Sequence, residues 1–122
     1  MKTVLDKLNH TIRTDEYSDG SYYELVLTRI HGLTMIQFND HDFNEEDVWS
    51  ERVIGTVNIL KYISAKFCHY CTECYRPDVV WLFEDMLEYV LHTLFSQEKL
   101  DKLLHKYNCK FYIDLVDTLI KP

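Results

Sequence analysis

Glycine and proline are scarce in this chain: its 122 residues include three glycines and two prolines. Because these residues interrupt helices and form turns, their scarcity beside an apolar content of 47% favours long helices over a many-turned sheet. The chain also lacks the roughly 20 consecutive apolar residues that cross a bilayer, and its first residues do not resemble a secretory signal. We therefore expect one intracellular domain spanning residues 1–122.

Positive charge is also in short supply. Thirteen Lys and Arg residues face twenty Asp and Glu residues, which gives a formal net charge of −7. A surface that follows nucleic-acid phosphates needs concentrated Lys and Arg, and no basic block compensates locally. Nucleic-acid binding is therefore not expected. The four cysteines, without a secretory signal, are expected to be reduced thiols in a cytosolic protein.

Helical spacing of apolar residues predicts two long helices at the centre of the chain. The first should run from about residue 48 to 71, and it is apolar over most of its circumference, as is typical of a helix surrounded by others. Pro77 followed by Asp78 is a typical helix start, and the amphipathic pattern after it predicts a second long helix over about 78–95.

Shorter elements are expected around this pair. The spacing predicts a first helix over roughly residues 2–14, a short helix capped by Ser96, and a final helix over 111–120. Residues 39–47 look like a polar linker.

Residues 22–38 are compatible with two structures. We favour a helix interrupted at Gly32, and the alternative is a β-hairpin that turns at His31-Gly32, because Tyr23, Leu25 and Leu27 alternate. With the first of these, the predicted fold class is all-α, with the 48–71 helix buried beside the 78–95 helix.

One motif at the start of the predicted central helix resembles the Bcl-2 family of apoptosis regulators, in the short form that some large DNA viruses encode. It reads Trp49-Ser50-Glu51-Arg52-Val53-Ile54-Gly55. The resemblance implies a Bcl-2-like helical bundle and an anti-apoptotic viral protein that sequesters the Bcl-2 homology 3 helix of pro-apoptotic host proteins. It implies no cofactor, and a place in the host-cell cytoplasm with peripheral association at the mitochondrial outer membrane.

The resemblance also implies a hydrophobic groove as the binding site. Arg52 would hold the ligand's Asp in a bidentate pair, whereas the alternative is a surface pair between Arg52 and Glu51. Trp49 lies one residue out of the family's register, and Glu51 replaces a family glycine, which predicts selective binding. The other expected lining residues, each of which also suits an ordinary core position, are Val26, Ile30, Leu33, Ile36, Phe38, Val53, Val57 and Phe111. An unfilled groove would also suit a homodimer.

A cysteine run supports a different hypothesis, a metal-binding helical adaptor. Cys68, Cys71 and Cys74 have the spacing of zinc or iron–sulfur ligands, and Cys109 is a candidate fourth ligand. Against this, cysteines on the apolar side of a helix are often simply buried.

Catalysis is not expected. His41-Asp42 and the pair of Glu88 and His92 come nearest to acid–base groups, and a solvated helix surface accounts for the second pair. The chain has no Gly-rich phosphate loop, nucleophile elbow or metalloprotease helix. The identity of the ligand, the oligomeric state and the removal of a C-terminal tail are left open by the sequence.

Overall fold

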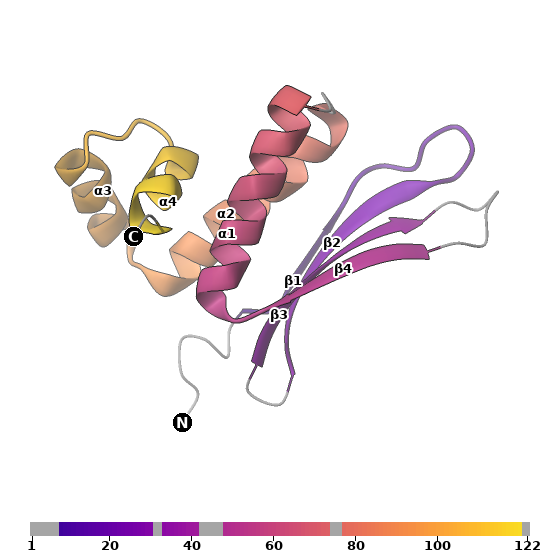
Figure 1. Cartoon of the computed structure of the whole chain (residues 1–122), viewed down its shortest axis with the longest axis horizontal. Helices are drawn as coiled ribbons and strands as arrows, with labels where there is room; N and C mark the ends of the chain where they lie inside the picture. Colours follow the sequence, from indigo (N-terminus) through magenta and orange to yellow (C-terminus); the bar gives the residue numbers. More distant parts are fainter. Residues whose placement is uncertain (1–7, 31–32, 42–47, 74–76, 121–122) are drawn as a thin grey trace.

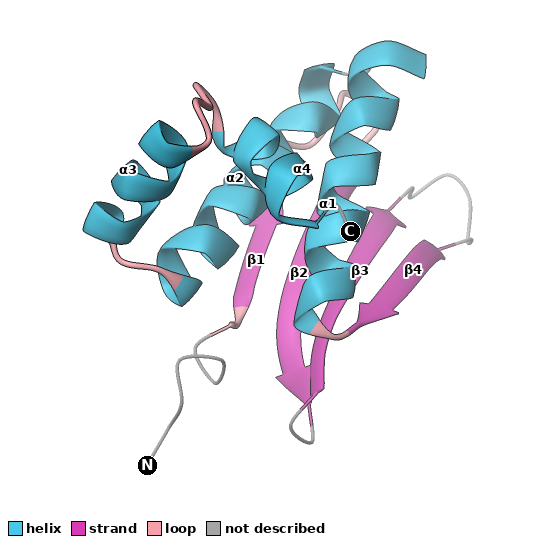
Figure 2. Cartoon of the chain, turned by 60° about the vertical axis from the view of Figure 1, so that its left-hand side comes forward, coloured by secondary structure: helices cyan, strands magenta, loops and turns pink. Residues whose placement is uncertain are grey.

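The computed structural model describes residues 8–30, 33–41, 48–73 and 77–120. These residues form a four-stranded antiparallel sheet followed by α-helices (Figure 1), so the predicted all-α bundle is wrong. The strand order β1-β2-β3-β4 is a meander, in which each strand pairs with the next one along the chain. Helices α1 and α2 pack across one face of the sheet, and α3 and α4 lie beside them (Figure 2).

The strands occupy the first half of the chain. Their bounds are β1 His10–Arg13, β2 Tyr22–Ile30, β3 Leu33–His41 and β4 Val48–Ile54. The predicted helix over 2–14 is wrong where the structure describes it, because β1 pairs with β2 there, with Ile12 opposite Leu25. Residues 1–7 and 42–47, which include most of the predicted linker, lie outside the described residues.

The segment 22–38 forms the β-hairpin that was the alternative prediction, and the helix prediction for it is wrong. Ile30 is the register partner of Leu33, where β2 ends and β3 begins. Leu25 pairs with Phe38 and Leu27 with Ile36, and all four side chains are at most 1% exposed. Every second side chain of a strand points to the same face of the sheet. These four apolar side chains can therefore be buried together in a hairpin, which explains why the segment forms strands and not a helix.

The predicted long helix over 48–71 is also wrong, because a turn at Gly55 divides this segment. Residues Val48–Ile54 form β4, and α1 begins at Thr56 and ends at Cys68. Gly55 separates them with a φ of 95°, a conformation that side chains with a Cβ rarely adopt. Its N–H donates to the carbonyl of Thr34 at 2.9 Å, and its carbonyl accepts the first α1 hydrogen bond from Ile59 at 2.9 Å.

The later helices match the sequence predictions closely. Helix α1 continues as a π-helical turn over His69–Glu73, and the remaining helices are α2 Pro77–Leu94, α3 Gln97–Lys106 and α4 Tyr112–Ile120. The Ser96 hydroxyl accepts a hydrogen bond from the Lys99 N–H at 3.1 Å, so the predicted cap is confirmed. The second long helix, expected over about 78–95, is confirmed as α2.

Aromatic rings join the sheet to the helices. Phe38 of β3 and Phe83 of α2 are both buried, and their ring centroids are 5.3 Å apart. Tyr70 stacks on Phe83 at 5.8 Å, and Tyr62 of α1 lies 6.3 Å from the same ring. Rings at these separations attract one another beyond the area that they bury. One continuous core therefore joins the two halves of the described chain.

Candidate functional site

The motif expected to begin a central helix beside the predicted groove lies on a strand. Trp49, Glu51, Arg52 and Val53 lie on β4, and the register partner of Arg52 is Gln37 of β3. No helix carries Arg52, so the helical scaffold that its predicted role required is absent at this position. The side chains of residues 48–54, and those of Ile30 and Val57, lie outside the described part of the structure.

The other predicted groove residues are dispersed. Ile36 and Phe38 belong to the core and are at most 1% exposed, and Val26 is half-buried on β2. Leu33 is 50% exposed at the β2–β3 hairpin, far from the start of α4, where Phe111 is 60% exposed (Figures 1 and 2). The structure therefore separates the described members of this set, and one of them, Phe111, lines a cavity.

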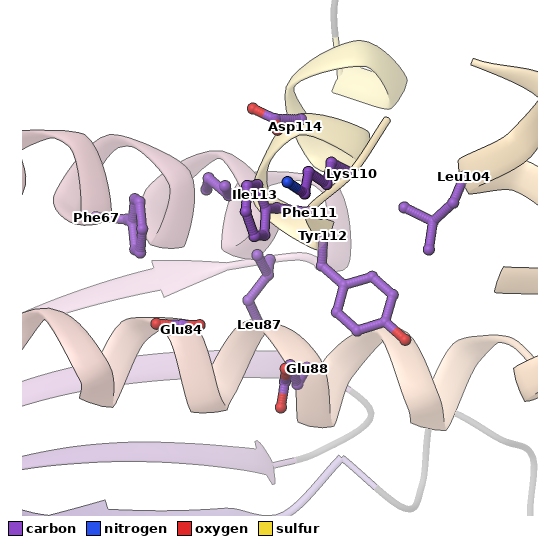
Figure 3. Close-up of a pocket in the computed structure, with 10 residues that line it drawn as sticks. All are labelled: Phe67, Glu84, Leu87, Glu88, Leu104, Lys110, Phe111, Tyr112, Ile113 and Asp114. Atoms are coloured by element: carbon purple, nitrogen blue, oxygen red, sulfur yellow. The ribbon is translucent and has the colours of Figure 1, made fainter. Parts of the chain in front are cut away.

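That cavity is an apolar cleft of about 620 Å³ among the four α-helices (Figure 3). Its volume lies within the range of known ligand sites. The cleft is lined by Phe67 of α1, by Glu84, Leu87 and Glu88 of α2, by Leu104 of α3, by Lys110 and Phe111 just before α4, and by Tyr112, Ile113 and Asp114 of α4.

Apolar side chains form the floor of the cleft. Leu87 is buried, whereas Phe67, Leu104 and Ile113 are half-buried and can still lose water-exposed surface. Phe111 is the most exposed of the large apolar residues that the structure describes. A partly exposed apolar floor of this kind gains free energy when another apolar surface covers it.

Charged side chains form the rim. Glu84 and Glu88 lie one turn apart on α2. Asp114 lies in the first turn of α4, and Lys110 lies in the connection that precedes this helix. All four are exposed. Within the part of the chain that the structure describes, no ion pair includes any of them, and the Lys110 ammonium lies 5.7 Å from the centre of the Phe111 ring.

A helix-terminating turn places Phe111 at the cleft. Asn108 has a φ of 54°, and its N–H donates to the carbonyl of His105 at 3.2 Å. The Cys109 N–H donates to the carbonyl of Leu104 at 2.8 Å. These two bonds form a Schellman motif, in which asparagine tolerates the left-handed backbone. The chain therefore turns sharply after α3 and delivers Lys110 and Phe111 to the mouth of the cleft.

Contacts with α1 hold α4 in place. The Ser64 hydroxyl of α1 donates to the Asp117 carboxylate at 2.5 Å. Leu115 and Val116 beside it are fully buried. A hydrogen bond to a carboxylate is stronger than one between neutral groups, so it helps to set the rotation of α4 about its axis. The Asp117 carboxylate therefore helps to hold α4 against α1, whereas Asp114 on the same helix is exposed at the rim of the cleft.

The cysteines do not form the predicted metal site within the described residues. Cys68 and Cys71 are exposed near the end of α1, Cys109 is half-buried after α3, and Cys74 lies outside the described residues. No group of three potential metal ligands occurs among the side chains that the structure describes. Although Cys68 is exposed as a residue, neighbouring atoms partly bury its thiol, and this desolvation raises its pKa. The negative charges of Asp117 and Cys71 add to the effect, so the neutral thiol is favoured.

The one candidate acid–base pair with described side chains, Glu88 and His92, lies beside the cleft. The His92 ring contacts Tyr112 edge-on, with 5.5 Å between centroids, and Glu88 belongs to the cleft rim. The side chains of His41 and Asp42 lie outside the described part. Among the described residues, no helix is long and apolar enough to span a bilayer.

Comparisons with protein-family models, with curated proteins and with solved structures give no match to this chain. The Bcl-2 resemblance therefore depends on the motif around Arg52 alone, and that motif lies on a strand. Most of the residues that line the cleft carry no signal in the sequence that marks them as a site. Glu84 and Glu88 have the pattern of an ordinary wet helix face, and only their packing opposite α4 distinguishes them.

Proposed function

We propose that this protein acts by binding another protein, and that it seats an apolar helix of that partner in the cleft among its α-helices. The observation that carries the proposal is Phe111, which is 60% exposed at the mouth of a cavity of about 620 Å³. Exposed aromatic residues beside a packed apolar pocket are typical of the residues that dominate binding energy at protein interfaces.

The distribution of polar groups favours a protein ligand over a small molecule. Small-molecule sites usually contain a few convergent polar groups that fix the ligand's orientation inside the pocket. Here the charged lining residues, Glu84, Glu88, Lys110 and Asp114, are all exposed at the rim, and the floor is apolar. An apolar centre inside a polar, solvated rim is the usual arrangement of a protein interface.

The walls of the cleft favour a helical ligand. An extended peptide gains its affinity by pairing with an open strand edge. None of the described residues that line the cleft belongs to a strand, and most of them belong to helices, whose backbone groups bond within the helix. Recognition must therefore come from side chains. An amphipathic helix places side chains at i, i+3, i+4 and i+7 on one face, and these can enter a cleft between helices together.

The resemblance-based ligand remains testable at this new site. The family resemblance places a pro-apoptotic homology 3 helix beside a central helix at 48–71, but β4 and the shorter helix α1 occupy this segment. Such a pro-apoptotic helix nevertheless has the amphipathic character that the cleft requires. It therefore belongs in the first binding panel, beside helices designed only for their pattern.

The test is fluorescence anisotropy with labelled helical peptides and the full chain. The panel contains a designed helix with leucines at i, i+3, i+4 and i+7 and glutamines elsewhere, together with pro-apoptotic homology 3 helices. We expect at least one peptide to bind, and Phe111→Ser to weaken that binding about tenfold, because about 1–2 kcal/mol of apolar burial is lost.

Leu33→Ser is the matched control. Leu33 is 50% exposed, and it lies on the hairpin far from the cleft, so its replacement should leave the affinity unchanged. Circular dichroism of both variants checks that they are folded. The proposal is rejected if no helix in the panel binds, or if Phe111→Ser and Leu33→Ser affect binding equally.

A further inference from the structure

We infer that the cleft selects an amphipathic helix with basic residues along one flank, and that Glu84 and Glu88 of α2 form ion pairs with this flank. This inference rests on the proposed helix-binding function, and it specifies the chemistry of the partner. Three carboxylates and one ammonium surround the apolar floor, so the rim presents an excess of negative charge to an incoming ligand.

The two walls differ in charge. Helix α2 contains no Lys or Arg from Pro77 to Leu94, and it contributes Glu84 and Glu88 to the rim on either side of buried Leu87 (Figure 3). The opposite wall carries Lys110 and Asp114, one charge of each sign. A ligand flank along α2 therefore meets uniform negative charge, whereas a flank along α4 meets a balanced pair.

The spacing of the two glutamates sets the pattern that the ligand needs. Residues four apart on a helix lie on the same side, about one turn from each other. Lys or Arg residues at i and i+4, or at i and i+3, along one side of the ligand would reach Glu84 and Glu88 together. A single basic residue could satisfy only one of them.

The rim carboxylates are available for such pairing. Among the described residues, ion pairs join Arg13 to Glu16, His69 to Glu73 and Lys102 to Glu98, and none of these six residues lines the cleft. Neither Glu84 nor Glu88 must therefore break an ion pair in this set before it meets a ligand. Complementary charge at a solvated rim mainly increases specificity and the rate of association.

The experiment compares three designed helices with the same leucine face. The flank beside the leucines carries lysines, glutamines or glutamates. At low salt, the lysine helix should bind the full chain about three- to tenfold more tightly than the glutamine helix, and the glutamate helix should bind more weakly. Salt should reduce these differences, because the rim is exposed to solvent.

Matched variants locate the charge effect. The double variant Glu84→Gln/Glu88→Gln should abolish the preference of the cleft for the lysine helix over the glutamine helix. The control variant Asp15→Asn/Glu16→Gln changes the net charge equally, in exposed residues outside the cleft, and should keep the preference.

The glutamine helix separates the two proposals. If it binds in a manner that depends on Phe111 but lysine and glutamate flanks bind equally well, helix binding stands and the inference about charge is overturned. The same inference fails if both double variants reduce the lysine preference equally, because net charge would then explain it. If no helix binds, the proposed function itself fails.

Discussion

The two halves of this chain differ in how far local sequence determines their structure. In the helical half, from Pro77 to Ile120, helices begin and end within about two residues of the positions that the sequence predicts. In the sheet half, from His10 to Ile54, the favoured prediction was helical and the structure is a four-stranded meander. The comparison shows that local signals suffice where hydrogen bonds are local and fail where they join distant residues.

The helical half carries its boundary signals in the chain itself. Pro77 starts α2, and Ser96 caps α3. Asn108 ends the turn after α3. Each signal acts within about four residues, the span of one helical hydrogen bond. In the sheet half, by contrast, Leu25 obtains its partner Phe38 only when the hairpin closes.

The largest expected effect tests whether the two halves fold together. Phe83→Ala removes the ring that contacts Phe38 of the sheet and Tyr70 after α1, and it should cost about 3–5 kcal/mol of unfolding free energy. Urea titration followed by circular dichroism measures this cost, with the exposed Glu84→Ala as a control within about 0.5 kcal/mol. Helix and sheet signals that disappear at different urea concentrations would show that the halves are independent.

A substitution at the junction distinguishes the two structures by the sign of its effect. In a continuous helix over 48–71, Gly55→Ala would stabilise the protein by about 1 kcal/mol. In the strand–turn–helix structure, the φ of 95° makes alanine strained, and the same change should destabilise by about 1–3 kcal/mol. Thermal and urea unfolding report the sign. Stabilisation would contradict the turn at Gly55.

A smaller effect tests the local signal in the helical half. Ser96→Ala removes the acceptor of the Lys99 N–H and should cost about 1 kcal/mol. Ser96→Asp keeps an acceptor at the same position and should retain nearly the full stability, as measured by urea titration. If aspartate were as destabilising as alanine, the cap would not be the reason that α3 begins there.

The smallest effect concerns the thiol at the end of α1. Burial raises the pKa of Cys68 above its ordinary value, with Asp117 and Cys71 contributing. Because the folded state favours the neutral thiol, this contribution to the free energy of unfolding is fully present below the ordinary thiol pKa. It is lost as the pH rises through the higher pKa of the folded state. Alkylation of Cys68 by iodoacetamide, followed by peptide mass spectrometry, should therefore rise at a higher pH in the folded chain than in urea. Coincident pH profiles would rule out this effect of folding.

The candidate site was less predictable than the helices that form it. Phe111 was identified from its apolar character, but in a set with Arg52 and Leu33, from which the fold separates it. Glu84 and Glu88 looked like part of a solvated helix face, and they are exposed. Their role at a cleft depends on the position of α4, which the contact between Ser64 and Asp117 helps to set across 53 positions of sequence.

By itself, the sequence determined the helices of the C-terminal half, because periodicity, a proline start and a serine cap act over one turn of chain. Tertiary structure alone decided that residues 22–30 pair with residues 33–41 as strands, that Gly55 separates a strand from a helix, and that a cleft opens beside Phe111. The physical reason is the range of the interactions. Strand pairing and cleft walls join residues far apart in the chain, and their free energy is gained only when the whole core is assembled.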